Sequence, residues 1–78
     1  MALTSLEEFI VGAHLVRVYA APIALPGVDG WVGAWAIYLL GQEPGSEPVR
    51  IGDTDLEESE AIALGMAKAI ASAVASTL

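Results

Sequence analysis

Residues 31–40, with the sequence WVGAWAIYLL, constrain the possible folds more than any other part of the chain. An extended strand points successive side chains to opposite faces, so residues two apart share a face. One face then carries Trp31, Gly33, Trp35, Ile37 and Leu39, and the other carries Val32, Ala34, Ala36, Tyr38 and Leu40. This segment is the clearest predicted strand, and the other elements have to be arranged around it.

Two shorter strands are predicted on either side of this segment in the chain. Residues 14–21 alternate in the same way, and Pro22 either ends the ladder or marks an edge. Residues 41–48, GQEPGSEP, have the composition of a loop. Residues 48–52 follow as a short third strand, which Gly52 ends.

Residues 1–12 are open to more than one interpretation: an arm, a short strand or a short helix. The run Ser5-Leu6-Glu7-Glu8 has the spacing of a capping box, which is typical of a helix start. The run Phe9-Ile10-Val11 before Gly12-Ala13 is equally typical of a strand that enters a tight turn.

A helix is predicted over residues 55–76. The run Thr54-Asp55-Leu56-Glu57 has capping-box spacing, and acidic residues crowd the first turns, where the helix dipole favours negative charge. The apolar stripe consists of Leu56, Ala63, Met66, Ala67, Ile70 and Val74. The opposite face consists of Glu57, Ala61, Gly65, Lys68, Ser72 and Ser76.

Together these elements predict an α+β fold, with a three-stranded antiparallel meander (14–21, 31–40, 48–52) covered on one face by the helix. Residues 1–78 are expected to form a single β-β-β-α domain. Because the helix stripe is rich in small residues, the sheet face with both tryptophans should supply the bulk of the core. The predicted core is Val16, Val18, Trp31, Trp35, Ile37, Ile51, Leu56, Met66 and Ile70.

The opposite sheet face is the predicted interaction surface. It should carry two of the three basic residues and both tyrosines, and these side-chain types are enriched at binding hot spots. The candidate residues are Arg17, Tyr19, Ala34, Ala36, Tyr38 and Arg50. Two competing ideas are that residues 6–11 fold back over this face, and that the helix surface at Gly65 and Ala69 mediates self-association instead.

Composition excludes several classes of protein. Ten acidic residues against three basic ones give a formal net charge of −7, which argues against binding to duplex nucleic acid. The absence of cysteine excludes disulfides and thiol chemistry and fits a reducing compartment.

Glu7 and Glu8 stand where a secretory signal would be basic, so we expect a cytoplasmic protein. Residues 61–78 are apolar, but Ala and Ser dominate and Lys68 interrupts them, so no membrane span is expected.

No catalytic or cofactor site can be recognised in the sequence. His14 is the only histidine, and the sequence shows no pattern that would pair it with a nucleophilic hydroxyl group. We therefore expect no enzyme activity and no cofactor. The acidic run 53–60 fails the pattern of a calcium-binding loop, because its sixth and twelfth positions are Glu58 and Leu64. Acidic residues near a helix start are the simpler interpretation, and a weak metal or ligand site over 53–60 is the alternative.

The run Gly52-Asp53-Thr54-Asp55-Leu56-Glu57-Glu58 leading into 61–71 resembles the strand-to-helix junction of HicB-like antitoxins, and Gly30-Trp31-Val32 resembles that family's hairpin entry. The resemblance implies a β-hairpin before an acidic, Ala-rich helix, with Asp53 and Thr54 as helix-start residues. This chain lacks the family's proline- and cysteine-containing segment before the helix. As a whole it resembles small bacterial β-β-β-α proteins, for which no activity is implied.

Two kinds of function follow from these observations. The first is a non-enzymatic module that binds a protein partner or itself, including as a homodimer, with an antitoxin-like neutraliser of a basic partner as one form. The second is a weak metal or ligand binder that uses the acids at 53–60.

Overall fold

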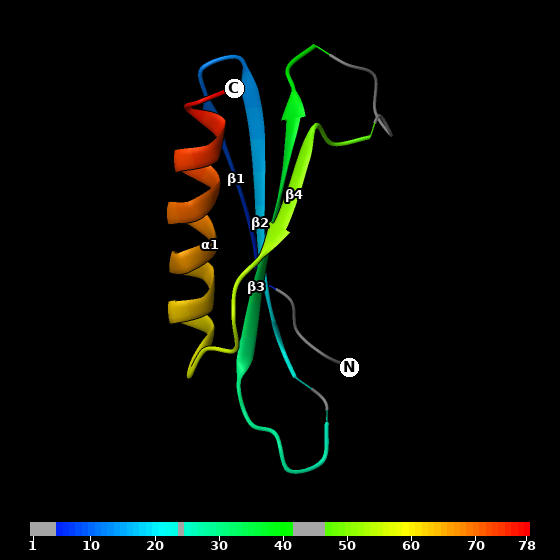
Figure 1. The fold of residues 1–78 in the computed structure, drawn as a ribbon, viewed down its shortest axis with the longest axis vertical. Helices are drawn as coiled ribbons and strands as arrows, with labels where there is room; N and C mark the ends of the chain where they lie inside the picture. Colours follow the sequence, from blue (N-terminus) through cyan, green and yellow to red (C-terminus); the bar gives the residue numbers. More distant parts are fainter. Residues whose placement is uncertain (1–4, 24, 42–46) are drawn as a thin grey trace.

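A four-stranded antiparallel sheet and one helix account for the regular structure of the described residues, which in this computed structural model are 5–23, 25–41 and 47–78. The elements are β1 (Ser5–Val11), β2 (His14–Pro22), β3 (Trp31–Leu39), β4 (Arg50–Asp53) and α1 (Glu60–Ala75). The strands lie side by side in chain order, and α1 packs on one face of the sheet, over β2 and β3 (Figure 1). The α+β class is confirmed, but the sheet has a fourth strand that the sequence prediction lacks.

The additional strand is β1. It pairs with β2 so that Glu8 lies opposite Arg17 and Phe9 opposite Val16. Gly12 makes the tight turn between them with a positive φ of 59°, which glycine adopts without steric cost. The strand interpretation of this segment is therefore correct, and the helix interpretation is wrong for residues 5–11. Residues 6–11 extend the edge of the sheet and do not fold over its face; residues 1–4 of the predicted arm lie outside the described residues.

The hairpin of β2 and β3 forms the centre of the sheet, close to the predicted bounds. Its pairing continues past Pro22, because the Ile23 amide donates to the Gly30 carbonyl oxygen at 2.9 Å. Val28 and Leu25 form a further bridge, so the tip of the hairpin projects beyond the helix (Figure 1). The predicted loop over 41–48 falls largely on residues 42–46, which lie outside the described residues.

Strand β4 pairs with β3 in a register that the sequence prediction places wrongly. Gly52 lies opposite Trp35, Arg50 opposite Ile37, and Ile51 opposite Ala36. A Cβ at Gly52 would lie 2.6 Å from Cε2 of the Trp35 indole, so only glycine fits there without displacing the ring. This packing turns Arg50 to the helix side of the sheet and leaves Ile51 on the other side, where 71% of it is exposed.

The segment after β4 continues along the edge of β3 before the helix begins. Thr54 exchanges hydrogen bonds with Gly33, and Glu57 does so with Trp31 at 2.7 and 2.8 Å. The helix starts only at Glu60, where the Ser59 hydroxyl oxygen accepts the Ile62 amide at 3.2 Å. The predicted start at 55, with Thr54 as cap, is wrong, and so is the helix-start role of Asp53 and Thr54. Their hydrogen-bonding groups serve the sheet instead.

The core lies between α1 and the inner face of β2 and β3. Val16, Val18, Trp35 and Ile37 pack against a stripe of alanines on the helix, namely Ala63, Ala67, Ala71 and Ala75. Gly33 lets the helix approach closely, because a Cβ there would lie 3.1 Å from Cβ of Ala67 and would clash with the Ala63 carbonyl.

Part of the predicted core is wrong. Leu56 and Met66 are 51% and 45% exposed, and Ile51 faces away from the helix. Two further predicted core residues are only partly buried: Trp31 is half-buried, and Ile70 packs against the margin of the core. The late start of the helix removes Leu56 from it, and the alanine stripe turns Met66 out toward solvent.

Candidate interaction surface

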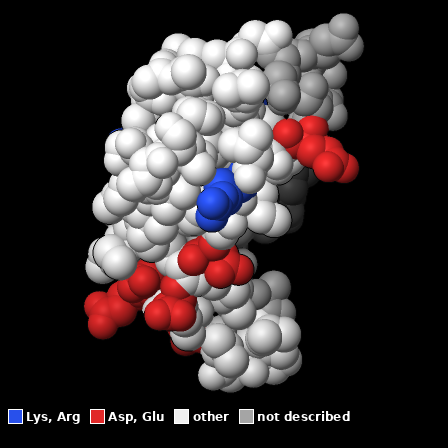
Figure 2. All heavy atoms as spheres, turned by 45° about the horizontal axis from the view of Figure 1, so that its top comes forward, with Lys and Arg blue, Asp and Glu red and all other residues white. Residues whose placement is uncertain are grey.

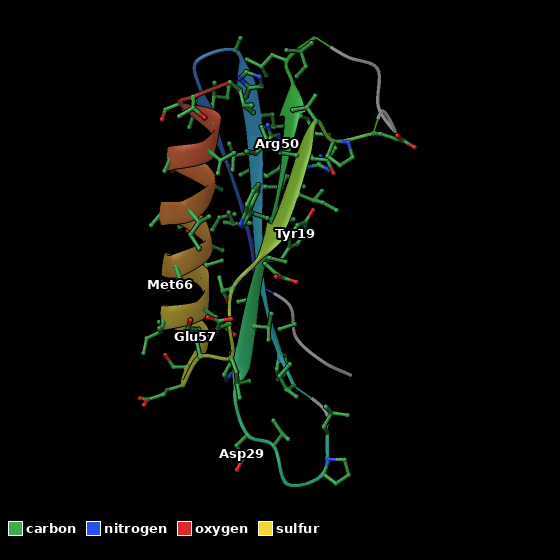
Figure 3. The ribbon with its side chains drawn as sticks, in the orientation of Figure 1. Tyr19, Asp29, Arg50, Glu57 and Met66 are labelled. Carbon is green, nitrogen blue, oxygen red and sulfur yellow. The ribbon has the colours of Figure 1, made fainter. Side chains whose placement is uncertain are left out.

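The side of the sheet that faces away from α1 forms one continuous surface, which we call the outer sheet face. Residues directly opposite each other on antiparallel strands point to the same side, so the register aligns the residues of this face in rows, and three of these rows cross three or more strands. The first row is Leu6, Tyr19, Ala34 and Asp53; the middle row is Glu8, Arg17, Ala36 and Ile51; the third is Ile10, Leu15 and Tyr38. Figure 3 shows Tyr19 on the side of the sheet opposite the helix.

Most of this face is apolar and uncovered by the described residues. Ile51 is 71% exposed, Ile10 63% and Leu6 53%. Tyr19, Ala34 and Tyr38 are partly buried by their neighbours on the sheet, and Ala36 is buried. An antiparallel sheet that faces water on one side ordinarily alternates apolar inside and polar outside. Here both sides are rich in apolar residues.

Arg17 is held in place at the centre of the outer sheet face. Its Nε donates to Oε2 of Glu8 on the neighbouring strand at 2.9 Å. Its guanidinium carbon lies 5.3 Å from the centre of the Tyr38 ring, within the range of a cation–π interaction. The hydrogen bond that Arg17 donates to Glu8, together with the carboxylate's charge, raises the pKa of Arg17 above its ordinary value. Arg17 therefore stays charged, and its side chain lies along the sheet.

The sequence predicted most of this surface but not all of it. Five of the predicted residues lie on the outer sheet face: Arg17, Tyr19, Ala34, Ala36 and Tyr38. Arg50 is wrong, because the register of β4 places it opposite Ile37 on the helix side. The residues of these three rows that the prediction missed are Leu6, Glu8, Ile10, Leu15, Ile51 and Asp53. The alternation along residues 5–11 would have placed Leu6, Glu8 and Ile10 on one face, but only if this segment had been assigned as a strand.

The alternative site, the acids at 53–60, has less geometric support. Asp53 ends β4 and Glu57 bridges to β3, so the run is spread along the sheet edge and not gathered around one point. Within the described ranges, no three His, Cys, Asp or Glu side chains lie close enough together to hold a metal ion. Figure 2 shows acidic side chains in two places, toward the lower end of the face in view and at its upper right, and a basic group near its centre; much of the remainder carries no charge.

Two other residues that the sequence analysis considers, His14 and Lys68, contribute to the fold. His14 opens β2 opposite Leu39 and Val11. Lys68 reaches from α1 to Glu7 of β1, with 3.1 Å between Nζ and Oε2. No helix in the described part of the chain is long and apolar enough to cross a membrane.

Comparisons with known proteins add no relative: no family model matches the chain, and no curated protein or solved structure matches it.

Proposed function

We propose that this protein is a non-enzymatic protein–protein interaction module and that the outer sheet face is its binding surface. The observation that carries the proposal is the exposure of Leu6, Ile10 and Ile51 on one continuous sheet face that α1 leaves uncovered. Large exposed apolar patches rimmed by polar residues mark interaction sites in soluble proteins. The charged residues Glu8 and Asp53 lie on the two edge strands and form such a rim.

The residue types on this face also suit binding. Tyr and Arg are the types most often found at hot spots, because they combine apolar area with a polar tip. Arg17 is already held by Glu8 and Tyr38, so binding would cost little of its side-chain entropy. Ala34 lies partly exposed between larger groups and leaves room for a side chain of a partner, whereas Ala36 is already buried by its neighbours.

Photo-cross-linking in native lysate tests this proposal. A photoreactive p-benzoylphenylalanine replaces Ile51 on the outer sheet face in one variant and Ile62 on the exposed side of α1 in the matched control. We expect protein adducts from position 51, whether to this chain or to another, and markedly fewer from position 62.

A third variant with the photoreactive residue at Glu58 tests the antitoxin-like alternative. Adducts to a basic protein from position 58, with none from position 51, would contradict the proposed surface and favour a neutraliser that uses the acidic end. The absence of adducts from all three positions would contradict an interaction module altogether.

A further inference from the structure

We propose that the occupant of the outer sheet face is a second copy of this chain, packed face to face about a two-fold axis that runs parallel to the strands between β2 and β3. This inference rests on the proposed function and names its partner. The product is a sandwich of two sheets with one helix on each outer side. Sheets packed in this way lie about 10 Å apart, with their strands within about 30° of each other.

Shape complementarity supports this arrangement. On the outer sheet face, β2 presents the large side chains Leu15, Arg17 and Tyr19, whereas β3 presents Ala34 and Ala36 opposite the last two. The proposed axis places β2 of one copy over β3 of the other and keeps each row in line. Arg17 then lies over Ala36 of the second copy, and Tyr19 over its Ala34. In these two rows the large groups of each copy meet small ones of the other, and in the third row Leu15 lies over Tyr38 of the second copy.

Charge selects this axis over the other two-fold arrangement. An axis perpendicular to the strands, along the middle row, would place Arg17 over Arg17 and Glu8 over Glu8 of the second copy. The proposed axis instead places Glu8 over Ile51 and keeps each Arg17 with its own Glu8 and Tyr38. Like charges brought together at an interface disfavour the complex.

The net charge of the protein does not oppose this association. Of the acids at 55–60, Glu57 pairs with Trp31 at the β4 edge of the sheet, and Glu60 belongs to α1. The proposed axis places the β4 edges of the two copies on opposite sides of the sandwich. With strands about 4.8 Å apart and sheets about 10 Å apart, the two copies of Glu57 are then more than about 15 Å apart. That distance exceeds the screening length of about 8 Å at physiological ionic strength.

The area of the two faces lies at the lower end of the range for a specific interface. The four strands have 7, 9, 9 and 4 residues, and each residue covers about 3.3 Å by about 4.8 Å of the sheet. Two such faces bury about 900 Å² in projection, close to the roughly 1,000 Å² expected of a specific interface, and the relief of the side chains adds accessible area to this projection.

The composition of the core gives a further reason for a second copy. The largest fully buried side chains are Ile37, Val16 and Val18, and the helix contributes alanines. A domain of this size buries only about 60% of the surface of its unfolded chain. Pairing the outer sheet faces adds the large apolar residues Leu6, Ile10 and Ile51 to a buried layer.

Sedimentation equilibrium of the full chain over a range of concentrations tests the proposal, with the variants Ile51→Asp and Ile51→Lys. We expect a reversible dimer whose dissociation constant rises by at least about tenfold in Ile51→Asp, because the new carboxylate would face Glu8 of the second copy. Ile51→Lys should weaken the dimer less than Ile51→Asp, since its ammonium would face the same Glu8. Equal weakening by the two variants would overturn the proposed axis, because it indicates that residue 51 meets itself.

The matched controls are Ile62→Asp and Ile62→Lys, on the exposed side of α1. Both are expected to leave the dimer unchanged; loss of the dimer in these controls alone would show that α1 mediates association and would overturn the proposal. Circular dichroism of every variant checks that the fold is intact. A wild-type chain that stays monomeric at millimolar concentration also overturns the second copy as partner. Foreign adducts at position 51 in the cross-linking experiment would then still support the interaction module.

Discussion

Trp35 shows how a single residue organises the inner side of this sheet. It is only 8% exposed, and its indole lies against the Cα of Gly52 on the neighbouring strand. Its Nε1 is buried without a hydrogen-bond partner among the described residues. Trp35 therefore stabilises the fold through buried apolar area, at the cost of one unsatisfied donor.

Replacing Trp35 with alanine should remove much of the stability of the protein. We expect Trp35→Ala to lower the free energy of unfolding by about 3–5 kcal/mol, because the cavity cannot be filled by the alanines of α1. Urea denaturation followed by circular dichroism at one fixed protein concentration measures it. Met66→Ala is the control, expected to cost less than about 1 kcal/mol because Met66 is largely exposed. Similar losses for the two variants would contradict this account of the core.

Two glycines should respond in opposite directions to the same substitution. Gly52→Ala is expected to destabilise the protein by about 1–3 kcal/mol, because its Cβ would overlap the rigid indole of Trp35. Gly65→Ala is expected to stabilise it by about 0.5–1 kcal/mol, because a Cβ there meets open space and alanine favours the helix. Thermal and urea unfolding measure both changes, and a stabilising Gly52→Ala would mean that β4 has another register.

At the scale of the elements, the periodicity of the sequence predicts the bounds and faces of the long strands, but it does not predict a register that depends on close packing. Strands β2 and β3 are long enough for alternation to define both their bounds and their faces. Strand β4 has four residues, so alternation alone leaves its two registers equivalent. The contact between Gly52 and Trp35 selects one of them, and that contact is not visible in the pattern. This is why five of the six predicted surface residues share a face and Arg50 does not.

The start of α1 was missed for a related reason. The predicted cap at Thr54 is occupied by hydrogen bonding to the edge of β3. Thr54 satisfies Gly33 and Glu57 satisfies Trp31, so these backbone groups are not available to a helix. Ser59, which was not predicted as a cap, takes that position, and the helix begins at Glu60.

The cap at Ser59 can be tested within the helix itself. Ser59→Ala should lower stability by about 1 kcal/mol and speed the hydrogen exchange of the Ile62 amide, which loses its acceptor. Ser59→Asp should retain most of the stability, because its carboxylate also caps and suits the helix dipole. Ser72→Ala, in the interior of the same helix, is the matched control and should cost nothing. Unchanged exchange at Ile62 in Ser59→Ala would place the helix start elsewhere.

At the scale of the whole molecule, the few positive charges are mostly engaged. Arg17 pairs with Glu8, and Lys68 pairs with Glu7. The formal net charge is −7, so the long-range field repels polyanions.

We therefore expect no tight binding to duplex DNA or RNA. Fluorescence anisotropy with a labelled duplex at physiological salt should show no saturable binding at submicromolar protein, because binding to phosphates requires clustered Lys and Arg. A repeat at low salt is the internal control, since a weak electrostatic contact would strengthen there. Saturable submicromolar binding at physiological salt would contradict the expectation.

The helix follows the sheet in the chain, and this order affects how the protein is synthesised. Residues 54–78, which include α1, are added after β4, and their addition takes roughly 1–5 s at about 5–20 residues/s. Until α1 has also left the ribosome, the strands that emerge before it lack their helix, so Val16, Val18 and Ile37 are exposed on one side and the outer sheet face on the other. A nascent chain in this state is prone to aggregate, so the late synthesis of α1 gives chaperones a few seconds in which to shield it.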